Sequence, residues 1–288
     1  MVYWIIAGIL IIALAAEFIR SYVSVGITRQ SYQNKKIPQA FHGYRILVLS
    51  DLHGKSFGSG NHRLTEKIIP LQPDLIVMAG DMIDKHQTNL RSFFALTDAL
   101  VGICPVVFAL GNHEIRLPKN VMEELKHGLS ERGVHWLDNA KQTMIGENGQ
   151  IELYGLTVDL NQYKGLNRTF DQSAVLDAEG IRGRLGAPNE EAFRMLIAHL
   201  PTLFEAYAEW GADLVIGGHM HGGLVRLPFI GGVLSPEIRF FPKYDAGVFH
   251  SGESTMFVSR GLGNGKWKFR FFNSGEILLI ELQSIVEV

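Results

Sequence analysis

Apolar residues form one long run at the start of the chain and short runs after it. Residues 1–16 contain no charged side chain, and Glu17 is the first to interrupt the run. As a helix, the segment from Tyr3 to Tyr22 would span roughly 30 Å, the thickness of a bilayer's hydrocarbon core. Tyr3, Trp4 and Tyr22 stand near its two ends, where interfacial aromatic belts form. The pattern predicts an N-terminal transmembrane helix.

A cleaved signal peptide is the alternative interpretation of this segment, because Ala13-Leu14-Ala15 could serve as a cleavage site. Signal peptides carry a basic stretch before the apolar run, and no Lys or Arg precedes it here. We therefore expect an uncleaved membrane anchor. The charged residues between Phe18 and Ser50 are all Arg or Lys, and the positive-inside bias then favours the cytoplasmic side for the rest of the chain.

Five apolar runs in the body, each bounded by polar residues, Gly or Pro, are typical of buried strands. Helical patterns lie between them, at residues 62–70, 88–100, 118–133 and 201–210, the last two opening with Pro and closing near Gly. This alternation predicts an α/β sheet covered by helices. The predicted strands are residues 45–49, 75–78, 106–110, 195–198 and 214–216.

The pattern changes after Gly222. Short strand-like runs at residues 224–229, 255–259 and 276–282 are separated by Gly and Pro, which predicts antiparallel β-structure. Residues 157–190 are polar and irregular, and we interpret them as a long connection or a cap over the site. The simplest division is a membrane helix over 1–22, a juxtamembrane linker over 23–43 and one domain over 44–288.

Composition excludes several classes of protein. The 288 residues carry a formal net charge of −2, with 47% hydrophobic and 19% charged side chains, which is unlike a disordered chain. A net charge this small gives no basic face for nucleic acid, so no nucleic-acid partner is expected. The one cysteine, Cys104, excludes a disulfide framework and a zinc site made of thiolates alone.

Candidate metal ligands follow each of the five predicted strands. The first strand runs into Asp51-Leu52-His53 and the fifth into His219-Met220-His221, and this spacing puts both side chains of a pair on one side of an extended backbone. Open α/β sheets place their ligand sites at such carboxyl ends. Carboxylate, imidazole and amide oxygen together suit Mn, Fe or Zn. The strand ends carry Asp51, His53, Asp81, Asn112, His113, Glu114, His199, His219 and His221.

Together and in this order, these motifs are specific. They resemble the complete motif set of the calcineurin-like metallophosphoesterases: Asp51-x-His53, Gly80-Asp81, Gly111-Asn112-His113-Glu114, His199 and Gly218-His219-x-His221. The resemblance covers roughly residues 44–284 and is closest to the membrane-associated bacterial phosphohydrolases of the YkuE and YaeI type. It implies a four-layer α/β/β/α sandwich, here preceded by the transmembrane helix, and a centre of two divalent metal ions.

The same resemblance implies a role for each motif residue. The first metal would be held by Asp51, His53, Asp81 and His221, and the second by Asp81, Asn112, His199 and His219, with Asp81 bridging. His113 would lie beside the substrate, suited to protonate the leaving group or to stabilise the equatorial oxygens. Glu114 could orient His113 or be an ordinary carboxylate at a helix start. Arg116 and Asn61 are candidate substrate contacts, although a plain surface role is the alternative for Arg116.

The implied activity is hydrolysis of a phosphodiester or pyrophosphate bond by a hydroxide activated between two metals. Some relatives of this type cleave the pyrophosphate of UDP-2,3-diacylglucosamine, so we expect a small-molecule or lipid-linked substrate at a membrane. A nuclease, a protein phosphatase and a non-catalytic scaffold are the alternatives on this fold. The anchor and the lack of a charged recognition face count against the first two, and the complete ligand set counts against the third. The sequence leaves metal identity and oligomeric state open.

Overall fold

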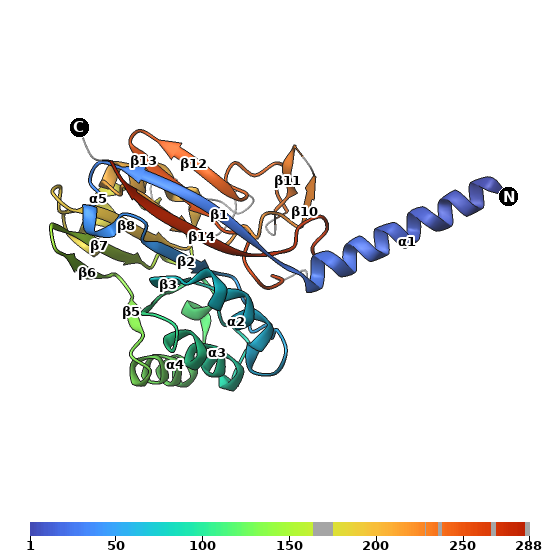
Figure 1. Ribbon diagram of the computed structural model, residues 1–288, viewed down its shortest axis with the longest axis horizontal. Helices are drawn as coiled ribbons and strands as arrows, with labels where there is room; N and C mark the ends of the chain where they lie inside the picture. Colours follow the sequence, from blue (N-terminus) through green and yellow to red (C-terminus); the bar gives the residue numbers. More distant parts are fainter. Residues whose placement is uncertain (164–174, 228, 236–237, 266–268, 286–288) are drawn as a thin grey trace.

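Two six-stranded sheets pack face to face in the body of the protein, and helices cover both outer faces (Figure 1). The computed structural model describes residues 1–163, 175–227, 229–235, 238–265 and 269–285. One apolar core lies between the sheets, and a further core lies under the helices on each side. The order of layers is helix, sheet, sheet, helix, which confirms the predicted four-layer α/β/β/α sandwich.

The first sheet contains the first three predicted strands. β2, β3, β4 and β5 run parallel, and the first three of these are covered on both faces, which is why their sequences are continuously apolar. The strand order is β1-β14-β2-β3-β4-β5. Its strands are β1 (Val25–Asn34), β2 (Arg45–Leu49), β3 (Leu75–Ala79), β4 (Val106–Ala109), β5 (His135–Leu137) and β14 (Gly275–Ser284), and its helices are α2 (His62–Ile68), α3 (Arg91–Val101) and α4 (Lys119–Glu131).

The second sheet contains the other two predicted strands, β8 and β9, at its centre. Its order is β12-β13-β9-β8-β7-β6, and a separate two-stranded sheet pairs β10 with β11. The strands are β6 (Ala140–Gly146), β7 (Gly149–Leu156), β8 (Phe193–Ala198), β9 (Leu214–Gly217), β10 (Val225–Leu227), β11 (Gly231–Leu234), β12 (Gly247–Ser251) and β13 (Ser254–Val258), and the helices on the outer face are α5 (Ala178–Leu185) and α6 (Phe204–Trp210).

The prediction of antiparallel structure after Gly222 is correct only in part. β10 pairs antiparallel with β11, and β12 with β13. However, β13 runs parallel to β9, and β14 runs parallel to β1. The reason is that these strands do not form a unit of their own but extend the two existing sheets. In the segment 157–190, the structure shows α5, while residues 164–174 lie outside the described residues.

Residues 23–43, expected to be a linker, contain β1. This strand follows α1 (Val2–Val23) after a single residue and pairs with β14 along its whole length. Its Tyr32 is buried, and the phenol donates a hydrogen bond of 2.9 Å to the carbonyl of Asp213 beside the second sheet. The run from Thr28 to Ser31 is polar because β1 is an edge strand with one open face, and this polarity conceals the strand in the sequence.

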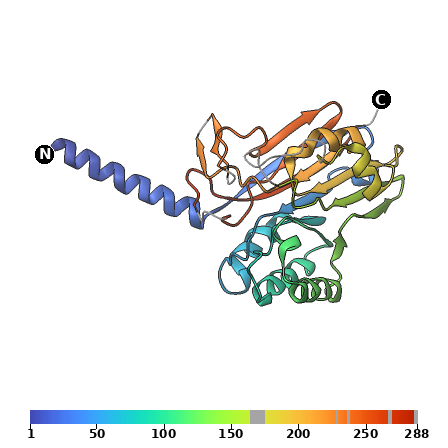
Figure 2. The same cartoon turned by 180° about the vertical axis from the view of Figure 1, so that it is seen from behind.

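Helix α1 extends away from the body, as the two opposite views show (Figures 1 and 2). It is long and apolar enough to cross a membrane, and none of its apolar window is buried against the protein. Its bounds agree with the transmembrane helix predicted over residues 1–22. Only its last turns contact the body, through residues such as Phe18 and Ser21.

Removing residues 1–24 and removing residues 1–43 should have different consequences. The shorter truncation takes away α1 and the few contacts of its last turn but leaves the sheets intact, so the melting temperature should fall by no more than a few degrees. The longer one also removes the buried Tyr32, Ile37 and Phe41 and exposes the edge of β14, so the melting temperature should fall by about 10 °C or more. Calorimetry of both truncated proteins tests this, and equal melting temperatures would contradict it.

Candidate metal centre

The loops that follow β2, β3, β4, β8 and β9 converge at one edge of the packed sheets. Backbone hydrogen bonds join neighbouring loops there, from Asp51 N to the carbonyl of Gly80 at 3.0 Å and from Gly218 N to the carbonyl of His199 at 3.0 Å. This convergence brings the predicted ligands together around two groups of side chains. The groups are Asp51, His53 and His221, and Asp81, His199 and His219, with the ligand atoms of each group within 4.8 Å of one another.

The first group is arranged as a cation would require. The Nε2 atoms of His53 and His221 face each other at 3.1 Å, and Asp51 Oδ1 lies 3.3 Å from His221 Nε2. Asp51 is fully buried and His221 nearly so. Two ring nitrogens and a carboxylate oxygen pointing at one position form a nitrogen and oxygen donor set suited to a first-row divalent metal.

The second group contains buried polar atoms that a cation would satisfy. His199 Nδ1 lies 2.8 Å from the carbonyl of Ala79, so Nδ1 donates there and Nε2 faces Asp81 Oδ2 at 3.2 Å. Asn112 Oδ1 is buried without a hydrogen-bond partner, and His199 Nε2 is buried with the carboxylate of Asp81 in front of it. Buried polar atoms are normally paired. A metal ion in contact with both atoms would satisfy them, so the residues present fit the implied metal.

Backbone strain marks the same positions. Five of the seven candidate ligands, Asp51, His53, Asp81, His219 and His221, have φ between +49° and +68°. Residues other than glycine rarely adopt this left-handed conformation, and such strain gathers at functional sites. The left-handed residue at each strand end turns the chain so that the ligand side chain points back toward the other ligands. The local backbone therefore places the ligands, at a cost of about 1 kcal/mol or more per residue.

His113 lies beside the two groups. Its ring centroid is 4.4 Å from that of His53, and its Nε2 lies 4.0 Å from Asp81 Oδ2. Burial lowers the pKa of His113 to about 4, so the ring is neutral at pH 7. The backbone N–H of Lys85 donates to Nδ1 at 3.2 Å, which favours the tautomer with the ring proton on Nε2, facing the site. Asp84, which sequence reasoning missed, lies 3.3 Å from the same Nδ1.

Glu114 begins a short 3-10 helix, Glu114–Arg116, as one of the two interpretations from the sequence expected, but its carboxylate does more than stand at a helix start. Its carboxylate is fully buried and accepts three backbone hydrogen bonds, from Asp81 N at 2.8 Å, Gly111 N at 2.9 Å and Ile83 N at 2.9 Å. It therefore ties the loop after β3 to the loop after β4. Burial and the nearby carboxylate of Asp81 raise the pKa of Glu114 to about 7.

Two glycines let a further loop approach Asp51. Leu262 N donates to the carbonyl of Ser50 at 3.0 Å, and Gly263 N to that of Asp51 at 2.7 Å. A Cβ atom at Gly261 would lie 2.5 Å from the Cβ of Asp51, so only glycine fits. The buried Arg270 holds this loop by donating to the carbonyl of Gly263 at 2.8 Å. Sequence reasoning found no role for this segment, although its paired glycines were the available signal.

A cavity of about 1210 Å³ opens over the candidate ligands. Arg116 lines it, so a substrate contact of Arg116 stays a prediction, whereas Asn61, the other candidate contact, is not among the lining residues. The side chain of Asn61 is buried, accepting from Phe57 N at 2.9 Å and donating to the carbonyl of Ser92 at 3.1 Å. From the segment expected to cap the site, the buried Tyr163 contributes to the wall. The lining includes His53, Asp81, Asn112, His113, Arg116, Tyr163, His219, His221 and Asn264.

Comparison with known proteins identifies the family of this chain. The family model of the calcineurin-like phosphoesterases matches residues 44–223, more than half of the chain. The protein belongs to the calcineurin-like phosphoesterase family. As a member, it is a metal-binding hydrolase of phosphoester bonds, and the resemblance stated from the motifs is confirmed.

Three relatives show how far the similarity extends. The uncharacterized metallophosphoesterase YkuE of Bacillus subtilis is 25% identical over 89% of this chain and 85% of its own length. The phosphodiesterase YaeI of Escherichia coli is 27% identical over 83% of this chain and 82% of its own. A Danio rerio protein described as a transmembrane protein with metallophosphoesterase domain is 25% identical over 86% of this chain, which spans only 55% of that protein.

Among solved structures, phosphopantetheinyl hydrolase from Mycobacterium tuberculosis superimposes with a TM-score of 0.48 at 14% identity, over 76% of this chain and 89% of that one.

Substitutions should separate metal binding from catalysis in this phosphoesterase. Asp81→Ala and His219→Ala should lose metal and activity together. His113→Ala should keep its metal but lose roughly 10²–10⁴-fold in turnover. His127→Ala, on the exposed surface of α4, is the matched control and should behave as wild type. Metal content by plasma mass spectrometry and turnover of bis-p-nitrophenyl phosphate measure both properties. Wild-type turnover in His113→Ala would remove His113 from the mechanism.

Glu114→Ala should destabilise the loops after β3 and β4, which carry candidate ligands. It leaves three buried N–H groups unpaired, which costs roughly 3 kcal/mol or more in the free energy of unfolding, and metal affinity should fall about 10–100-fold as the two loops separate. Urea denaturation of the metal-free protein and metal titration measure the two effects. Glu131→Ala, at the exposed end of α4, is the control. If both variants match wild type, Glu114 does not hold the loops.

Proposed function

We propose that this phosphoesterase hydrolyses a phosphodiester or pyrophosphate bond in a small or lipid-linked substrate, using two divalent ions chosen from Mn, Fe and Zn. The observation that carries the proposal is the buried, unpaired acceptor Asn112 Oδ1 beside the second ligand group, in which His199 Nε2 faces Asp81 Oδ2 at 3.2 Å. The first ion would be held by Asp51, His53, Asp81 and His221, and the second by Asp81, Asn112, His199 and His219.

The chain's own groups fit phosphoester hydrolysis. Two bound divalent ions lower the pKa of a shared water toward neutrality and offset charge on the phosphoryl oxygens. His113, neutral and carrying its proton on Nε2, would donate a hydrogen bond to a phosphoryl or leaving-group oxygen. Arg116 on the cavity wall would hold a second phosphate or a ribose-linked oxygen. Tyr163 packs on His219 with ring centroids 5.0 Å apart and helps to exclude water.

Two features support a lipid-linked or nucleotide-diphosphate substrate such as UDP-2,3-diacylglucosamine. Helix α1 would keep the enzyme at a bilayer as a single-pass anchor, with the domain over residues 44–288 on the cytoplasmic face. The cavity exceeds the size of a simple phosphate site, and three cationic side chains, Lys85, Arg91 and Arg116, line it. Cations in that number suit a substrate with more than one phosphate.

The test is an assay of the purified full chain in detergent with Mn²⁺, Zn²⁺ or Fe²⁺. Bis-p-nitrophenyl phosphate, p-nitrophenyl phosphate and UDP-2,3-diacylglucosamine are the substrates. We expect activity that a chelator abolishes, with kcat/KM highest for the UDP-lipid. Activity insensitive to chelator, or none with any divalent metal, would overturn the two-metal proposal. Turnover of the diester without the UDP-lipid would reject only the substrate class.

A further inference from the structure

Large apolar side chains are exposed on one part of the body. Apart from α1, the described residues that are most exposed include Phe229, which is fully exposed, Phe240 at 72% and Phe241 at 64%. They lie in the hairpin β10–β11 and the segment that follows it, and Phe229 and Phe241 line one hollow together with Phe272 of a neighbouring loop. We define the apolar rim as Phe229, Ile230, Ile238, Phe240, Phe241 and Phe272. Exposed apolar residues scattered singly are ordinary, but a contiguous group marks an interaction surface.

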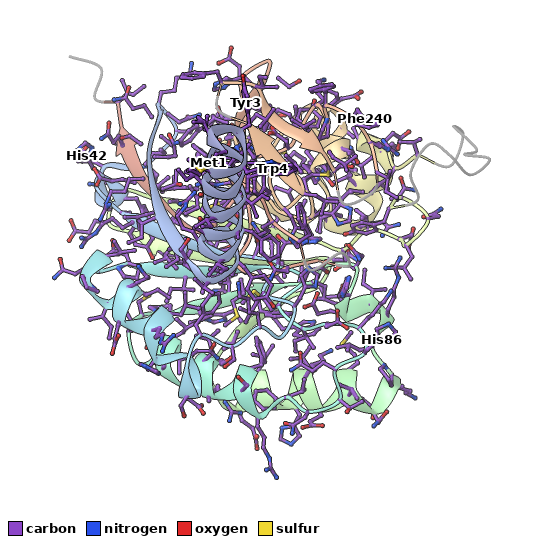
Figure 3. All side chains as sticks on the ribbon, turned by 90° about the vertical axis from the view of Figure 1, so that its right-hand side faces the viewer. Met1, Tyr3, Trp4, His42, His86 and Phe240 are labelled. Atoms are coloured by element: carbon purple, nitrogen blue, oxygen red, sulfur yellow. The ribbon has the colours of Figure 1, made fainter. Side chains whose placement is uncertain are left out.

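The apolar rim adjoins the end of the candidate membrane helix. Arg20, in the last turns of α1, lines the same hollow of about 710 Å³ as Phe229, Phe241 and Phe272. The ring of Phe18 contacts that of Phe269 at 5.5 Å between centroids. The hairpin β10–β11 lies on the side of the body from which α1 projects (Figure 1), and the view toward that side shows Phe240 on the same face, to the upper right of the helix (Figure 3).

The charges around this hollow are balanced. Arg226 pairs with Asp245 at 2.6 Å, Lys243 with Glu205 at 2.7 Å and Arg260 with Glu276 at 2.8 Å. The surface therefore combines exposed phenylalanines with cations that already have partners. Such a surface gains little from anionic lipid and much from burying its apolar side chains.

We propose that the apolar rim is a second membrane contact, lying in the interface of the bilayer that α1 crosses. The inference rests on the membrane anchoring given under the proposed function. The anchor keeps the bilayer within reach of the rim at all times, so the second contact needs little intrinsic affinity. A partner protein or a second copy would have to reach a surface that the bilayer already adjoins.

The apolar rim is joined closely to the candidate metal centre. Asn273, next to Phe272, donates from Nδ2 to the carbonyls of His221 at 2.7 Å and Gly223 at 2.6 Å. The rim hairpin begins at Val225, four residues after His221. Seating the rim in the bilayer would therefore set the tilt of the body and hold the cavity at one height, where an amphiphilic substrate can reach it from the membrane.

Fluorescence quenching in vesicles tests this with the full chain. Single cysteines for an environment-sensitive label are introduced at Phe229→Cys and Phe240→Cys in a Cys104→Ser background. Ile145→Cys, 83% exposed on β6, is the matched control, and Ile9→Cys reports on α1 itself. The proteins are reconstituted into phosphatidylcholine vesicles whose acyl chains carry bromine roughly 5–10 Å below the headgroups. Turnover of bis-p-nitrophenyl phosphate in the same samples reports on folding and on the proposed activity.

We expect the labels at positions 229, 240 and 9 to lose fluorescence to the brominated lipid and the label at position 145 to be unaffected. If positions 229 and 240 behave like 145 while position 9 is quenched, the anchor stands and the second contact is overturned. An unquenched label at position 9 would overturn the anchoring and the inference together, whether or not the diester is hydrolysed. Cross-linking between copies through positions 229 and 240, without quenching, would assign the rim to a second copy instead.

Discussion

Two carboxylates, Asp51 and Asp81, are buried together where the two sheets meet, and the rest of the site is arranged around this enclosed negative charge. Burying a carboxylate costs several kcal/mol unless donors or cations face it. Backbone N–H groups of His219 and His113 donate to these carboxylates at 3.0 and 2.7 Å. His199 lies between them. Burial lowers the pKa of its imidazole, but the two carboxylates outweigh this effect and raise the pKa of His199 to about 10. Without metal a proton occupies the position that a cation is suited to take, so binding must displace it.

The positions of the candidate ligands are fixed more by the backbone than by the choice of side-chain rotamers. Left-handed turns at the ligand positions direct the side chains inward, and Glu114 joins two of the turns through their N–H groups. On the other side, Gly261 allows the loop after β13 to press directly on Asp51. Loops connected in this way cannot separate one at a time, so the site is already formed before a metal binds. Preorganisation of this kind lowers the cost of binding.

Structural features that depend on neighbouring residues could be predicted from the sequence. Features that depend on packing between distant segments could not. Strand ends such as Leu49 and Ile216 were evident because buried parallel strands are continuously apolar and the motif residues follow at once. β1 was missed because its partner β14 lies about 250 residues away and its open face is polar. Asn61 was predicted to contact substrate because the sequence does not distinguish a polar residue that faces substrate from one that accepts a backbone hydrogen bond. Asn61 accepts one from the N–H of Phe57. The role of Glu114 likewise depends on donors 31 and 33 residues away.

Helix α1 and the candidate metal centre share contacts, and a strand, not a flexible linker, follows the helix. Lys55, two residues after His53, donates to the carbonyl of Tyr22 at 2.7 Å and so satisfies an open carbonyl at the end of the helix. On the other side, Asn273 joins Ser21 of the helix to the carbonyl of His221. The loops that carry two candidate ligands therefore also set the direction in which α1 leaves the body. A flexible tether would keep the enzyme near a membrane in every orientation. A helix fixed to the ligand loops and continued by a sheet strand would instead hold the cavity in one orientation relative to any membrane that the helix crossed.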